Sequence, residues 1–169
     1  MTIPKEYDVE ELARCISSLD SWACTGPDKE LDCRIAFALG HDWFDDDNSW
    51  RDQVQRDGFH AAWTLPQVWG RDFIPRYTSS YDAVLDEITN VMPEADQINW
   101  SCDPSGCGAA VGVWRLSVPV SEDENHQPYI WPHGKGYANS GLHAMLRAFL
   151  QAVLQRETGE RFKAPENGR

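Results

Sequence analysis

Apolar side chains recur every three or four residues in four segments of the chain, a spacing that places them on one face of an α-helix. The pattern predicts a helix that begins after Asp8, a second over 29–39, a third from Ser79 or Ser80 to Pro93, and a last from Asn139 or Ser140 to about Glu157. Val9 and Tyr81 open two of these apolar stripes. We expect one shared core, formed by Leu31, Ile35, Val84, Ile88, Leu146, Phe149 and Val153.

Two segments after the third predicted helix are typical of β-strands. Residues 97–102 and 109–118 are rich in Val, Ile, Leu and Trp, and Asp103-Pro104-Ser105-Gly106 between them is a turn sequence. This predicts an antiparallel hairpin. Residues 59–65 and 129–131 are further strand candidates, while 41–48 is too acidic for a core element and predicts an exposed loop.

These elements predict an α+β fold in which a small, mainly antiparallel sheet packs with three to four helices in a layered α/β/α-type sandwich. The 169 residues fit a single domain, 1–169, with a core over about 8–158 and a polar tail over 160–169.

The net charge of −12 is unevenly distributed. Residues 1–60 carry 14 acids and 6 bases, residues 61–125 carry 10 and 3, and residues 126–169 carry 3 and 6. Such an acidic body repels phosphates, which disfavours direct nucleic-acid binding. It favours a protein partner with a basic surface.

Eight tryptophans are more than one core of this size needs, so some are expected at a binding surface. The acidic runs mark two candidate loops. The partner-binding residues predicted there are Trp43, Phe44, Asp45, Asp46, Asp47, Trp50, Glu122, Asp123 and Glu124. A calcium EF-hand is excluded, because counting from Asp45 places Trp50 and Arg56 where Gly and Glu are needed.

A second hypothesis concerns an anion. Glycines precede the last predicted helix, whose first amides are suited to a negatively charged or nucleotide-like ligand. The anion-binding candidates are His133, Gly134, Lys135, Gly136, Asn139 and Ser140. The run is not an ATPase phosphate loop, and a glycine turn without a ligand is the structural alternative.

The five cysteines do not have the spacing of a zinc site, and reduced thiols are expected. A disulfide or metal joining Cys102 and Cys107 across the hairpin is the alternative. The five histidines lie in no catalytic motif, and His143 on the last helix is interpreted as a packing residue. No cofactor and no metal site are predicted.

Two motifs carry a resemblance to a known family. The first is Gly26-Pro27-Asp28-Lys29-Glu30-Leu31-Asp32-Cys33-Arg34-Ile35, and the second is Pro75-Arg76-Tyr77-Thr78-Ser79-Ser80-Tyr81-Asp82-Ala83. A closing Ala/Leu-rich helix over 142–153 follows them. This arrangement resembles the phage ABA-sandwich domain family over about residues 9–155. The resemblance implies a compact sandwich encoded by a phage or prophage, with no assigned activity. Both motifs also have local explanations, such as Asp28 capping a helix.

The sequence therefore favours a non-enzymatic phage accessory protein. It would bind a host or phage protein through acidic, Trp-bearing loops in the bacterial cytoplasm, and inhibition of host defence is the most specific version. A small-ligand binding protein is the alternative, and a hydrolase without a recognisable motif is the third hypothesis. No catalytic residue, no membrane span and no direct nucleic-acid contact are predicted.

Overall fold

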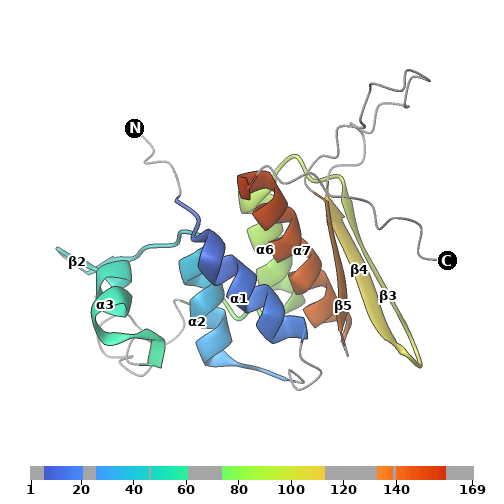
Figure 1. Cartoon of the computed structure of the whole chain (residues 1–169), viewed down its shortest axis with the longest axis horizontal. Coiled ribbons are helices and arrows are strands. Elements are labelled where there is room, and N and C mark those ends of the chain that lie inside the picture. Colours follow the sequence, from blue (N-terminus) through green and yellow to red (C-terminus); the bar gives the residue numbers. More distant parts are fainter. Residues whose placement is uncertain are drawn as a thin grey trace.

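The computed structural model describes residues 6–20, 26–45, 47–60, 74–112, 133–138 and 140–158. The helices are α1 (Val9–Asp20), α2 (Lys29–Ala38), α3 (Trp50–Asp57), α6 (Tyr81–Val91) and α7 (Gly141–Thr158). The strands are β1 (Phe44–Asp45), β2 (Asn48–Ser49), β3 (Gln97–Asp103), β4 (Gly106–Gly112) and β5 (His133–Ala138). From the sheet outwards, α6 and α7 come first, then α1 and α2, and α3 lies farthest away (Figure 1). The predicted α+β class is confirmed, and within the described residues the helices lie on one side of the sheet.

The larger sheet has the order β3-β4-β5 and is antiparallel throughout. Trp100 pairs with Ala109, and Cys107 pairs with both Cys102 and Ala138. Because side chains alternate across a strand, β4 buries Cys107, Ala109 and Val111 on one face. That face lies against α7, which contacts all three strands (Figure 1).

Helix α7 is the centre of the core. It packs on the sheet through one side and on α1 and α6 through others. Its buried residues include Leu146, Phe149 and Val153, each fully shielded from solvent. The other four predicted core residues, Leu31, Ile35, Val84 and Ile88, are also buried in the same cluster. The predicted core is confirmed.

Side-chain caps fix where the helices begin. Asp8 accepts a hydrogen bond from the Glu11 amide at 3.0 Å, and Asp28 accepts one from the Leu31 amide at 3.0 Å. Ser80, rather than Ser79, caps α6. These acceptors satisfy first-turn amides that have no partner inside the helix. At the other end of α2, Gly40 has a φ of 76°, a conformation that glycine adopts without steric cost.

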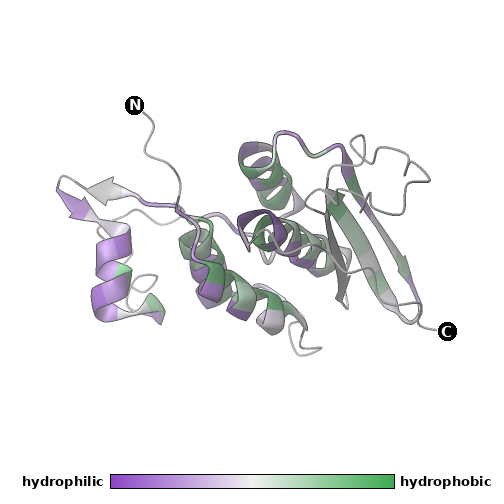
Figure 2. Ribbon diagram, turned by 45° about the horizontal axis from the view of Figure 1, so that its top comes forward, coloured by the Kyte–Doolittle hydropathy of each residue, from purple (hydrophilic) through white to green (hydrophobic). Residues whose placement is uncertain are grey.

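Several predicted elements differ from the structure. Residues 50–57 form helix α3 with Ser49 as its N-cap, and Phe59 and His60 are helical rather than extended. The rest of 59–65, the strand candidate 129–131 and residues 113–118 of the second predicted hairpin strand lie outside the described residues. Figure 2 shows why α3 escaped the apolar pattern, since this helix is mostly hydrophilic. Val9 and Tyr81 are exposed, so neither belongs to its predicted buried stripe.

Arg156 near the end of α7 joins three distant segments. Its guanidinium donates hydrogen bonds to the Val91 carbonyl at 2.7 Å and to the Tyr7 hydroxyl at 3.2 Å. It also forms an ion pair with Glu94 at 3.4 Å. These contacts bind the residues before α1 and after α6 to the last turns of α7.

Candidate functional site

Two exposed aromatic rings stack on each other where α6, β3 and α7 meet. Tyr81 is the first residue of α6, and Trp100 lies in β3, at one edge of the sheet that the described residues form. Their ring centroids are 5.4 Å apart with an interplanar angle of 29°. The two residues are 40% and 45% exposed, although aromatic rings of this size are usually covered. We call this pair the aromatic platform.

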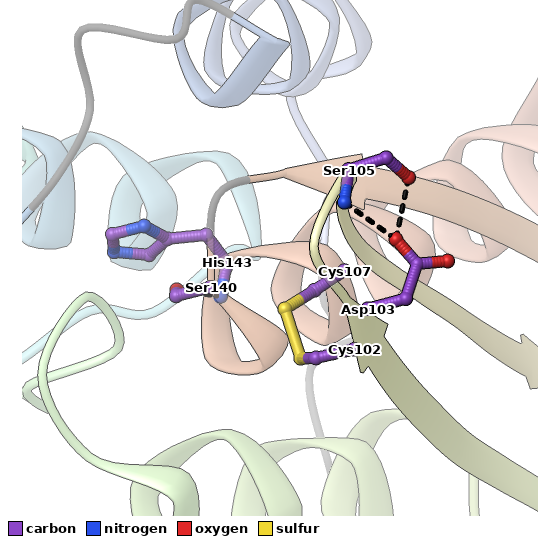
Figure 3. Close-up of a disulfide and its surroundings, with 6 residues drawn as sticks. All are labelled: Cys102, Asp103, Ser105, Cys107, Ser140 and His143. Atoms are coloured by element: carbon purple, nitrogen blue, oxygen red, sulfur yellow. Dashed lines mark hydrogen bonds between the residues drawn. A yellow bond between two sulfur atoms is a disulfide. The ribbon is translucent and has the colours of Figure 1, made fainter.

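The backbone of α7 forms the floor of the aromatic platform. A Cβ placed on Gly141 would lie 2.7 Å from Cδ1 of Trp100 and 2.9 Å from the Tyr81 hydroxyl. Glycine is therefore the one residue that lets both rings approach the first turn of α7 this closely. Ser140 fixes that turn, because its hydroxyl accepts a 3.1 Å hydrogen bond from the His143 amide. Both residues are labelled at the start of α7 in Figure 3. The rings are held in place by the main chain as well as by each other.

The segment that carries the aromatic platform is strongly acidic. Residues 77–112 contain six Asp or Glu and no Lys, Arg or His. Asp82 and Asp86 are exposed on α6, and Asp103 is exposed at the end of β3. Hydrogen bonds from the Ser105 hydroxyl and amide hold the pKa of Asp103 below its usual value, so this carboxyl is ionised at neutral pH. The platform thus stands in a field of negative charge.

A disulfide closes the hairpin two residues beyond Trp100. Cys102 and Cys107 are paired in register across β3 and β4, and they are linked by an S–S bond (Figure 3). The expectation that all cysteines are reduced is wrong for this pair, and the alternative disulfide is correct. The four-residue turn Asp103–Gly106 brings the two sulfurs together, because it places the flanking residues opposite each other.

Cys15 and Cys33 are free thiols buried in the core. Burial raises the pKa of the Cys15 thiol far above its ordinary value and raises the pKa of Cys33 to about 12. Both groups are therefore neutral and unreactive in the folded protein. Cys24 lies outside the described residues.

The two sequence motifs bind each other in the structure. The Thr78 amide donates a 2.7 Å hydrogen bond to Oδ1 of Asp32, and the Thr78 hydroxyl accepts a 2.8 Å bond from the Asp28 amide. Nε2 of His143 lies 3.1 Å from the Thr78 carbonyl oxygen. His143 is 2% exposed, which agrees with its interpretation as a packing residue. Asp28 and Asp32 of the first motif and Thr78 of the second thus join α2, α6 and α7.

A second buried polar cluster lies close by in the sequence. Oε1 of Glu87 is 2.7 Å from Nε2 of His41, and Oε2 accepts a 3.0 Å hydrogen bond from the Tyr77 hydroxyl. Burial and the neighbouring Glu87 carboxylate raise the pKa of Tyr77 well above its ordinary value, so this phenol keeps its proton. Trp43 stacks on the His41 ring with centroids 5.3 Å apart.

The His41–Glu87 pair resembles the base and orienting acid of a hydrolase, but the third partner is a tyrosine. In the described part of the chain, the side-chain hydrogen-bond partners of the His41 ring are Glu87 and Tyr77, neither of which is a Ser or Cys nucleophile. Instead, His41, Tyr77 and Glu87 satisfy one another's hydrogen-bonding groups. We interpret it as a polar tie between the end of α2 and helix α6.

The first predicted acidic loop is largely structural. Trp50 is fully buried and makes edge-to-face contacts with Phe37 and Trp43, so its predicted role as an exposed anchor is wrong. Trp43 is half-buried against the core. Asp42 accepts hydrogen bonds from the Ser49 hydroxyl and the Arg51 amide.

The structure describes less of the remaining members of the acidic, Trp-bearing set. Asp47 is exposed, and Phe44 and Asp45 form strand β1. Asp46 and the second cluster, Glu122, Asp123 and Glu124, lie outside the described residues. Of the predicted anchors whose side chains the structure describes, Trp50 is buried and Trp43 half-buried, and the exposed aromatic rings among the described residues, Tyr81 and Trp100, lie elsewhere.

The predicted anion loop is a strand. His133, Gly134, Lys135 and Gly136 belong to β5 and pair with residues 109–112 of β4, rather than forming a turn before α7. Ser140 is used as the helix cap, which was one of the two predicted caps. Asn139 lies outside the described residues. The first four candidates are thus part of the sheet and do not form a loop around a ligand.

Metal-binding clusters and membrane-spanning helices are both absent from the described residues. No three His, Cys, Asp or Glu side chains converge there as they would around a metal ion. Among the same residues, no helix has the length and apolarity needed to cross a bilayer.

No protein-family model, curated protein or solved structure matches this chain. The aromatic platform was missed in the sequence because Tyr81 fits the apolar stripe of α6 and Trp100 fits the alternation of β3. The signal that points to it is Gly141 directly after a helix cap, a position where close approach of another side chain is allowed.

Proposed function

We propose that this protein is a non-catalytic binding protein that contacts a basic protein partner through the aromatic platform. The observation that carries the proposal is the stacked, exposed pair of Tyr81 and Trp100 on the glycine floor of α7. Exposed aromatic rings that are already ordered lose little entropy on binding, and Trp and Tyr are frequent hot spots of protein interfaces.

The negative charge around the aromatic platform favours a partner with a basic surface. The six acids and absence of bases in residues 77–112 repel an acidic surface and attract a basic one. An arginine is well suited to both features, because its guanidinium stacks on aromatic faces and pairs with carboxylates such as Asp82 or Asp86. We therefore propose an arginine-bearing protein surface as the occupant. The resemblance to a phage family makes a host or phage protein our proposed partner, with inhibition of host defence as the most specific form.

Affinity capture from a bacterial lysate tests the proposal with matched variants. Trp100→Ala removes one ring, and the double variant Asp82→Asn/Asp86→Asn removes two exposed charges of α6. Val9→Ala removes an exposed apolar residue of α1, and Glu10→Gln/Asp52→Asn removes two exposed charges far from the platform. A thermal melt of each variant shows that the fold is kept.

The expected result is one basic protein retained by the wild type and both controls but lost with both platform variants. Purified and titrated, it should bind Trp100→Ala weaker by about 2 kcal/mol, as for an interface hot spot. The acid variant should associate more slowly and depend less on salt. Retention of every bound protein by the platform variants, equal losses in the controls, or no specific binding would overturn the proposal.

A further inference from the structure

The disulfide lies on the same face of β3 as the aromatic platform. Successive side chains of a strand point to opposite faces, so Trp100 and Cys102, two residues apart, share one face of β3. Their cross-strand partners on β4, Ala109 and Cys107, are both buried on that face. Figure 3 shows the disulfide on the side of the hairpin that faces Ser140 and the start of α7. The S–S bond and the floor of the platform are therefore neighbouring parts of one structure.

The disulfide has one accessible end. Cys102 is exposed on the edge strand, whereas Cys107 is 7% exposed in the central strand. We therefore expect an incoming thiolate to attack the Cys102 sulfur and to displace Cys107 as the departing thiolate. The exposed Cys102 differs in this respect from Cys15 and Cys33, whose neutral, buried thiols take no part in exchange.

The disulfide also holds the end of β3 in place. All residues from Asn99 to Asp103 are exposed, so little apolar burial fastens this half of the strand. In the described sheet, β4 is the one strand that pairs with β3. Helix α7 also packs less closely on β3 than on β4 or β5. A covalent link in such a segment restricts fraying that hydrogen bonds at a strand end allow.

From these three observations we propose that Cys102–Cys107 is a redox-active disulfide that controls the aromatic platform. A dithiol reductant opens it, the end of β3 loosens, and Trp100 no longer keeps a fixed position over Gly141. The binding consequence rests on the proposed function, whereas the redox step stands without it. We expect reduction to lower partner affinity about tenfold, within the usual range of coupling between two sites.

The exchange balances as a two-electron transfer. One thiolate of the dithiol attacks the Cys102 sulfur, forming a mixed disulfide and releasing the Cys107 thiolate, which takes up a proton. The second thiolate of the reductant then attacks its own sulfur in the mixed disulfide and releases Cys102, which is also protonated. The protein gains two electrons and two protons, and the reductant becomes a disulfide.

The test uses the folded wild-type chain and dithiothreitol without denaturant. Alkylation followed by peptide mass spectrometry should label Cys102 and Cys107, while Cys15 and Cys33 remain unlabelled. Hydrogen exchange of residues 97–112 should accelerate severalfold on reduction, whereas that of residues 142–153 in α7 should not change. The variant Cys102→Ala/Cys107→Ala is the control, expected to match the reduced protein and to ignore the reductant.

Two results would overturn the redox step: a disulfide that dithiothreitol leaves intact in the folded protein, or exchange of residues 97–112 that is equal in both redox states. The binding consequence is measured separately on the captured partner, as affinity for oxidised and reduced protein. Equal affinities would reject control of the platform by the disulfide. If Trp100→Ala loses binding while the oxidised and reduced wild type bind equally, this inference fails and the proposed function stands. If Trp100→Ala keeps binding, the proposed function fails, and the redox step is judged by labelling and hydrogen exchange alone.

Discussion

The amide of Thr78 and the carboxylate of Asp32 are joined by a 2.7 Å hydrogen bond, although 46 residues separate them in the chain. This bond connects the two motifs that are most distinctive in the sequence. Asp32 is 5% exposed, and its carboxyl is held by the Thr78 amide rather than by a basic side chain. A carboxyl in such a place favours its neutral form, because burial penalises the charged form.

Stability should therefore depend on pH through Asp32. Burial raises the pKa of this carboxyl to about 6, above the value of about 3.9 in an unfolded chain. The folded protein holds the proton more tightly, so this stabilisation is complete below about pH 4 and is lost as the pH rises through 6. The loss is on the order of 2–3 kcal/mol.

Urea unfolding between pH 4 and 7 measures this effect. Asp32→Asn cannot titrate and keeps an oxygen that accepts the Thr78 amide, so its stability should vary less with pH than that of the wild type. Asp52→Asn, at an exposed position of α3, is the control and should keep the wild-type dependence. Parallel curves for wild type and Asp32→Asn would contradict the prediction.

Core truncations should be costly. Ile88 is 1% and Phe149 0% exposed, and both lie in the cluster around α7. Ile88→Ala should lower the free energy of unfolding by about 2–5 kcal/mol and Phe149→Ala by about 3–5 kcal/mol, through lost burial and a residual cavity. Chemical denaturation gives these values, with exposed Asn90→Ala expected to change stability by less than about 0.5 kcal/mol. Losses below about 1 kcal/mol at both core sites would argue against this core.

Gly141→Ala should disturb the aromatic platform while leaving the stability of the fold nearly unchanged. The new methyl group would lie 2.7 Å from Trp100, but the rings it meets are exposed and able to move aside. Alanine also favours the helix by up to about 1 kcal/mol. We therefore expect a melting temperature close to that of the wild type, an altered near-ultraviolet circular dichroism spectrum, and weaker partner binding. An unchanged spectrum would mean that the rings do not rest on Gly141.

The two tryptophans that differ most in burial should give opposite results. Trp50→Ala removes a fully buried ring and should lower stability by about 3–5 kcal/mol. Trp100→Ala removes a ring that is 45% exposed and should cost much less stability while weakening binding. Measuring a thermal melt beside each affinity distinguishes these roles. Comparable loss of stability in both variants would show that Trp100 is structural.

The elements that local chemistry specifies were predictable. Each of α1, α2, α6 and α7 has an apolar stripe and a capping residue, and the turn Asp103–Gly106 has the composition of a tight reversal. The seven predicted core residues follow from those stripes, since a stripe has to be buried against another element.

Elements that depend on a partner were not predictable. Helix α3 has one aliphatic residue, Val54, and its signal was the cap Ser49 accepting the Asp52 amide. Strand β5 contains two glycines, and glycine does not favour the extended conformation. This segment becomes a strand because it pairs with β4. The aromatic platform needs α6, β3 and α7 together, so no single stretch of sequence contains it. The Cys102–Cys107 disulfide follows from hairpin register, which spacing alone left undecided.

The central position of α7 also determines how this protein can be made. Three strands and two helices rest on residues 141–158, which are synthesised after all of them. Until those residues leave the ribosome, the apolar surfaces of α1, α6 and β4 that pack on α7 stay uncovered, and the nascent chain is open to chaperones and proteases. A stop codon anywhere before residue 141 should therefore yield degraded polypeptide instead of a smaller working version.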